Sequence, residues 1–188
     1  MKSLGFVLSV VLMSLSSLAF AQSEAPKSSA AIAPKPVAQS DAQKSFDQLK
    51  TLAGTWEGHL TTVPQAPEVE GKLVQLSLRV TSMGNALMHE IKVGGRPDDP
   101  ITMLYLDGDR LMLTHYCDAG NRPRMTGKML PDGKTVEFEF LDVAGSTQYG
   151  HMHHAVFTAI DANHHTEDWT FMEGDKPVQV HFDLRRVQ

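Results

Sequence analysis

The stretch Val74-Gln75-Leu76-Ser77-Leu78-Arg79-Val80-Thr81 alternates apolar and polar residues over its whole length. Successive side chains of a β-strand point to opposite faces, so this period of two predicts a strand with one buried and one solvated face. Val136-Glu137-Phe138-Glu139-Phe140 repeats the pattern further along the chain. A sheet that is buried on only one side is typical of antiparallel proteins.

Ten such runs, rich in β-branched, aromatic and leucine residues, follow one another along the chain. They are Leu52–Thr62, Lys72–Thr81, Ala86–Val93, Ile101–Asp107, Arg110–Tyr116, Pro123–Leu130, Thr135–Leu141, His151–Ile160, His164–Met172 and Val178–Arg186. Short segments typical of hairpin turns, such as Asp107-Gly108-Asp109 and Glu173-Gly174-Asp175, separate several of them. Strands joined by tight turns pair with each other, so a meander is expected.

The runs predict an all-β protein. Ten meandering strands without a second layer of helices close most simply into a single up-and-down antiparallel barrel, which leaves no exposed edge. A sandwich of two sheets is the alternative. Ahead of the first strand, Phe46, Leu49 and Leu52 fall at helical spacing just before Gly54, which predicts a short N-terminal helix.

The N-terminus has the composition of a targeting segment. Residues 1–21 carry Lys2, an apolar run from Leu4 to Leu18 and the sequence Ala19-Phe20-Ala21, which together predict a cleaved secretory signal peptide. An uncleaved membrane anchor is the alternative. Residues 22–42 are mostly Ala, Pro, Ser, Gln and Lys and predict a disordered linker. A single barrel domain is expected over residues 43–188, in the periplasm or secreted.

Composition restricts the partners. The chain has 22 acidic and 17 basic residues and a net charge of −5, so no basic patch predicts nucleic-acid binding. Cys117 is the single cysteine, so no intramolecular disulfide can form. It is either a buried thiol or a free one. We expect a small-molecule ligand and no integral membrane contact after signal cleavage, and the sequence leaves the oligomeric state open.

The first predicted strand opens with Gly54-Thr55-Trp56-Glu57-Gly58, after the short helix, and the last one ends with Leu184-Arg185-Arg186. This combination resembles the calycin (lipocalin-like) superfamily. The resemblance implies a barrel in which the tryptophan closes one end and a basic residue of the final strand packs over it. Gly54 and Trp56 match the motif, and Arg185 or Arg186 is the expected partner, with a structural role for all of them.

Within that superfamily, the ten strands and the Gly-Thr-Trp-x-Gly opening most resemble nitrobindin-like barrels and bacterial lipocalin-like domains of unknown function. The resemblance covers residues 46–187. It implies a haem site held by a histidine near the C-terminus, for which His181 is the positional match. His59-Leu60 departs from the further glycines that nitrobindin-like proteins carry after the opening.

Nine histidines are many for so small a domain, and strand parity indicates where they point. If the apolar parity faces inward, five titratable residues lie in the lumen and His181 faces outward. The predicted lumenal residues are His89, His115, His151, His153 and Glu167.

Two interpretations of these residues stay open. In one, His151 and His153 share a strand face and bind a divalent metal together with His115 or Glu167. In the other, the histidines are polar lining of a wet pocket, hydrogen-bonded to nearby side chains and water. A Cys117–His115 nucleophile pair lacks an orienting acid and an oxyanion donor, so no catalytic residue is assigned.

The leading hypothesis is a binding protein whose barrel accepts a small, mostly apolar ligand with a polar or anionic end. Tyr105, Phe157 and Trp169 are expected to supply apolar contact area. His89, His115, His153 and Glu167 are expected to orient the polar end, and Arg124 to hold an anionic group at the mouth. The alternatives are a metal- or haem-binding barrel, with metalloenzyme activity possible, and a structural module whose lumen is filled by side chains.

Overall fold

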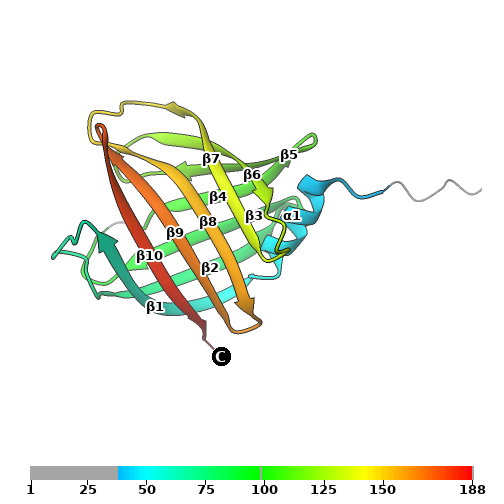
Figure 1. Cartoon of the computed structure of the whole chain (residues 1–188), viewed down its shortest axis with the longest axis horizontal. Coiled ribbons are helices and arrows are strands. Elements are labelled where there is room, and N and C mark those ends of the chain that lie inside the picture. The colour runs from blue at the N-terminus through cyan, green and yellow to red at the C-terminus, as the bar shows by residue number, and fades with distance from the viewer. Residues whose placement is uncertain (1–37, 98, 188) are drawn as a thin grey trace, which may run out of the picture. The chain divides into compact units, whose positions relative to one another are not determined.

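The computed structural model describes residues 38–97 and 99–187 (Figure 1). The predicted signal peptide, most of the predicted linker and Gln188 lie outside the described residues. One α-helix, α1 (Asp41–Lys50), precedes the strands, and a 3₁₀ turn, η1 (Ser82–Gly84), joins the second strand to the third. The strands are β1 (Gly54–Val63), β2 (Leu73–Thr81), β3 (Ala86–Val93), β4 (Ile101–Asp107), β5 (Arg110–Tyr116), β6 (Arg122–Met129), β7 (Thr135–Ala144), β8 (His151–Asp161), β9 (His164–Glu173) and β10 (Lys176–Arg186).

The ten strands form one closed antiparallel barrel in which each strand pairs with its neighbours in the chain. The sheet closes between its first and last strands, where Trp56 lies opposite Arg186 and Val63 opposite Gln179. Closure leaves no unpaired edge strand. The predicted up-and-down barrel is therefore confirmed, and the sandwich alternative is wrong.

Alternation places the core inside the barrel. In β2, Val74, Leu76 and Leu78 are buried while Gln75 is exposed, as the period of two predicts. Val136 and Phe138 of β7 join the same core cluster. Burial of these side chains is the main stabilising contribution, at about 2 kcal/mol for each large apolar side chain.

Helix α1 covers one end of the barrel, which we call the closed end. Ser40 caps the helix by accepting a hydrogen bond from the Gln43 amide, so the helix begins at Asp41, one residue before the predicted end of the linker. Its apolar face buries Phe46 and Leu49 in the barrel core. The Ser45 hydroxyl also accepts a hydrogen bond from the amide of Met129, the last residue of β6. None of the helices described here is long and apolar enough to cross a membrane.

The Gly54-Thr55-Trp56-Glu57-Gly58 motif joins the two ends of the sheet at the closed end. The Arg186 guanidinium lies 4.1 Å from the centre of the Trp56 ring and donates to the Ala53 carbonyl at 2.7 Å. A Cβ at Gly54 would lie 2.2 Å from that guanidinium, and one at Gly58 would lie 1.8 Å from the Asp183 carbonyl oxygen of β10. Both glycines are therefore required for close packing.

Consecutive strands run in opposite directions, so every second connection lies at the same end of the barrel. The longer connections lie at the end opposite to the helix, which we call the open end. Residues 64–72, 94–100, 117–121 and 145–150 connect the strand pairs there. Asn121 links two of these loops by donating to the carbonyls of Ser146 and Gly150. Residues of the 64–72 loop, Arg96, Pro100 and Asp118 contribute to the lining of the pocket at this end.

Candidate functional site

A pocket of about 500 Å³ occupies the open end of the barrel. Its walls are apolar side chains from the strands, including Leu60, Ile91, Met152, Phe171 and Phe182. Residues of the 64–72 loop and Asp118 line its mouth. The volume is in the range of small-molecule sites in proteins.

Three buried residues supply the polar end of this pocket, and we call them the floor residues: His89 of β3, His115 of β5 and Trp169 of β9. They have exposed fractions of 1%, 4% and 3%. The Trp169 ring lies 5.8 Å from the His89 ring and 5.6 Å from the His115 ring, measured between centroids. The predictions that these three residues face the lumen agree with this placement.

Glu167 lies behind the floor and is completely buried. Its carboxylate accepts three hydrogen bonds: from His89 Nε2 at 3.0 Å, His165 Nε2 at 3.1 Å and Trp169 Nε1 at 3.0 Å. Burial alone raises the pKa of a carboxyl group. Here the charges and hydrogen bonds of His89 and His165 outweigh burial and lower the pKa of Glu167. The carboxylate is therefore ionised, and it fixes the orientation of two floor residues.

His115 is a neutral imidazole. Burial, with a smaller contribution from the charge of His89, lowers its pKa to about 3. Its Nδ1 lies 2.8 Å from the Thr102 hydroxyl, and its Nε2 has no hydrogen-bond partner among the described residues. The second ring nitrogen is thus available to a molecule in the pocket.

The ring nitrogens that do not contact Glu167 are also informative. His89 Nδ1 and His165 Nδ1 are buried and have no hydrogen-bond partner within residues 38–97 and 99–187. Buried polar atoms in folded proteins are rarely left without a partner, because each costs about 1–3 kcal/mol. Since His89 lines the pocket, a bound molecule can supply the missing partner.

Phe157 does not line the pocket. It is buried beneath the floor, with its ring centroid 5.6 Å from that of Trp169 and 6.0 Å from that of His89. It packs against two of the floor residues from the side away from the pocket lining.

Tyr105 and Arg124 do not line the pocket either. Thr102 and Leu104 occupy the inward positions of β4, so Tyr105 faces outward and its hydroxyl lies 3.1 Å from that of Thr114. Arg124 is exposed and forms a bidentate ion pair with Asp142 on the neighbouring strand. Both residues were predicted to contact a ligand in the pocket. Strand parity turns Tyr105 away from the lumen and the ion pair holds Arg124 beside Asp142, so neither residue lies where that contact requires.

His151 and His153 are half-buried and lie beside Phe140, outside the pocket lining. A β-bulge is the reason: Met152 pairs with Phe171 and His154 with Thr170, which leaves His153 as an additional residue in β8. Met152 therefore lines the pocket in place of the histidines. Of the proposed metal ligands, His151 and His153 lie together, with Nε2 of the first 3.4 Å from Nδ1 of the second, but His115 and Glu167 do not join them.

The residues that the resemblance assigns near the C-terminus also differ. Arg186, and not Arg185, stacks on Trp56, while Arg185 is largely exposed beside Asp183. His181 is half-exposed and its Nδ1 lies 2.6 Å from Asp168, on the face opposite to the pocket-lining Val180 and Phe182. His181 therefore does not fit the role of a haem ligand in this pocket.

Sequence reasoning missed Thr102 and His165 as parts of the site. Both have inward parity in their strands, and both are buried. His165 also shares the face of Glu167 and Trp169, which is a signal visible in the sequence. Its contact with Glu167 depends on side-chain rotamers that parity does not specify.

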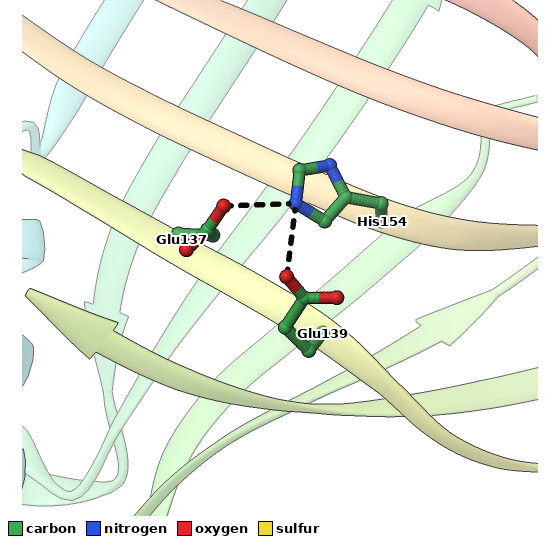
Figure 2. A group of neighbouring side chains, drawn as sticks. All are labelled: Glu137, Glu139 and His154. Atoms are coloured by element: carbon green, nitrogen blue, oxygen red, sulfur yellow. Dashed lines mark hydrogen bonds and ion pairs between the residues drawn. The ribbon is translucent and has the colours of Figure 1, made fainter.

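A second cluster of titratable residues lies on the outer face of the barrel. Figure 2 shows His154 of β8 between Glu137 and Glu139 of β7, with its Nε2 3.3 Å and 3.7 Å from the two carboxylates. Among the described residues it is the one group of three whose possible metal-binding atoms all lie within 4.8 Å of one another. Lys128 also contacts Glu137, at 3.4 Å. The contacts that are present make this cluster a surface ion-pair network, and such networks contribute little stability.

The sequence matches no protein-family model and no curated protein. Its structure resembles that of Rv2717c from M. tuberculosis, with a TM-score of 0.56 and 14% identity, over 77% of this chain and 98% of that one. It also resembles a protein of unknown function from the DUF3598 family of Nostoc punctiforme, with a TM-score of 0.53 and 15% identity. That match covers 74% of this chain but 48% of the Nostoc protein. Likeness at this identity shows the fold alone, which is a closed antiparallel β-barrel.

Proposed function

We propose that this protein is an exported carrier or receptor for a small, mostly apolar molecule, which binds in the open end of the barrel. The observation that carries the proposal is the combination of an apolar-walled pocket of about 500 Å³ with a buried polar floor. Such a pocket provides area for the hydrophobic effect and a few fixed polar groups for orientation.

The polar floor supports binding more than it supports packing. A barrel interior with a purely structural role has no need for an ionised carboxylate and unpartnered imidazole nitrogens next to a cavity. The polar end of the ligand would lie against His89 and His115, and its apolar part against Ile91, Phe171 and Phe182.

Binding can be tested with N-phenyl-1-naphthylamine, a neutral apolar probe whose fluorescence rises in a dry pocket. We expect saturable enhancement with the mature protein. Val178→Trp fills the pocket from β10 and should abolish it, whereas Gln179→Trp on the opposite face of the same strand should not. Absence of enhancement with the wild type, or equal loss with both variants, would contradict the proposal.

Export is the second part of the proposal and is supported by the N-terminal sequence alone. Expression of the full chain in a Gram-negative host should yield a periplasmic or secreted protein whose intact mass corresponds to a chain beginning at Gln22. A cytoplasmic, unprocessed chain would contradict this part without affecting the binding test.

A further inference from the structure

The charges around the pocket are mainly negative. The charged residues that line it are Glu68, Arg96, Asp118 and Glu173. Arg96 and Asp118 form an ion pair at 2.6 Å, so their charges offset each other. The negative charges of Glu68 and Glu173 remain in the lining. An anionic group that enters the pocket is therefore opposed by the carboxylates at the mouth.

The hydrogen bonds of the floor leave one ring nitrogen of His89 without a partner among the described residues. A carboxylate can only accept, so His89, His165 and Trp169 must each donate their N–H to Glu167. Nδ1 is the second ring nitrogen of His89, and it is a buried atom that lacks a partner. A hydroxyl group can pair with this nitrogen in either direction, because a hydroxyl both donates and accepts.

We propose that the pocket selects molecules whose polar end is positively charged or neutral over molecules with an anionic end, in the order amine, alcohol, carboxylate. The proposal rests on the binding function above and narrows it, because the sequence predicts a polar or anionic end and the charges of the pocket disfavour the anionic one. The indole of Trp169, beside both floor histidines, adds a π-face that also favours a cation.

Displacement of bound N-phenyl-1-naphthylamine by decylamine, 1-decanol and decanoate, below their micelle concentrations at pH 7.5, tests this order. The three competitors share one chain and differ in the end group. Decylamine should displace the probe at a concentration at least roughly tenfold lower than decanoate. Equal or stronger displacement by decanoate would overturn the inference and leave the binding function standing, whereas failure of the probe itself to bind would overturn the binding function.

A pair of double variants separates the pocket charges from the net charge of the protein. Replacing both mouth carboxylates, Glu68→Gln with Glu173→Gln, should reduce the preference for decylamine over decanoate by roughly threefold. The matched control Glu137→Gln with Glu139→Gln removes the same charge from the outer face of β7 and should leave the preference unchanged. A preference that falls equally in both variants, or in neither, would overturn the role of the mouth.

Discussion

Among single residues, His115 is expected to make the fold sensitive to acid. The pKa of His115 is about 3 in the folded barrel, against an ordinary value of 6.5. Between these two pH values the imidazole is mostly protonated in the unfolded chain and mostly neutral in the folded chain. The contribution of neutral His115 to stability is complete above pH 6.5 and is lost as the pH falls from 6.5 towards 3. Between pH 7.5 and 5.0 the loss is about 2 kcal/mol.

The variant His115→Gln removes this titration but keeps a polar group near Thr102. Its free energy of unfolding, measured with urea, should fall less than that of the wild type between pH 7.5 and 5.0, by about 2 kcal/mol. His181→Gln, at a half-exposed histidine on the outer face, should keep the loss seen in the wild type. If His115→Gln and wild type lose the same stability, His115 is not the neutral buried group inferred here.

Glu167 holds the floor together through three donors, and its replacement tests that network. Glu167→Gln keeps the size of the side chain but directs an NH₂ group at groups that already donate, so we expect a loss of about 3 kcal/mol in the free energy of unfolding at pH 7.5. The lowered pKa of Glu167 means that the wild type keeps this contribution above pH 4.5, the ordinary value, and loses it in more acidic solution. Glu139→Gln on the exposed face is the control, and a loss as small as that of the control would contradict the network.

Within a strand, the alternation of side chains predicts which residues face the lumen only up to a β-bulge. Leu87, His89 and Ile91 alternate regularly in β3, so the position of His89 could be read from the sequence. The same rule fails at His151 and His153, because β8 gains a residue there and Met152 takes the inward position. No local residue pattern marks this bulge, since the pairing with β9 decides it.

The turn between β2 and β3 is another element that local sequence does not favour. Ser82 and Met83 have φ values of 51° and 54°, a left-handed conformation that asparagine or glycine adopts more easily, and Met83 is fully exposed. Met83→Gly should therefore raise the free energy of unfolding by about 0.5–1 kcal/mol, measured by urea denaturation. Met83→Ala is the control for loss of the side chain, and an equal effect of both variants would show that the backbone conformation is not the cause.

At the scale of the whole molecule, the fold was more predictable than the site. Ten alternating runs with short turns leave few closed topologies, and the barrel follows from the need to bury one face and pair every edge. The floor instead depends on side chains from β3, β5 and β9, and His89 and Glu167 are 78 residues apart. Parity brings such residues to one face, but only the three-dimensional register decides which of them touch.

Arg186 lies at the closed end of the barrel and does not line the pocket, and this separation gives a further prediction. The Arg186 guanidinium donates to the carbonyls of Ala53, Ala162 and Thr51 and stacks on Trp56, so it joins the last strand to both the helix connection and the β8–β9 turn. Arg186→Lys keeps the charge but loses the planar fork, and we expect a loss of about 2 kcal/mol in the free energy of unfolding.

Under conditions in which the Arg186→Lys variant remains folded, probe binding at the open end should match that of the wild type, because Arg186 does not line the pocket. Val178→Trp should show the opposite combination, with binding lost and most stability retained. Arg185→Lys, at the exposed neighbour, should change neither property. Weaker probe binding by folded Arg186→Lys would mean that packing at the closed end controls the shape of the pocket, and the two ends would then have to be treated as one cooperative unit.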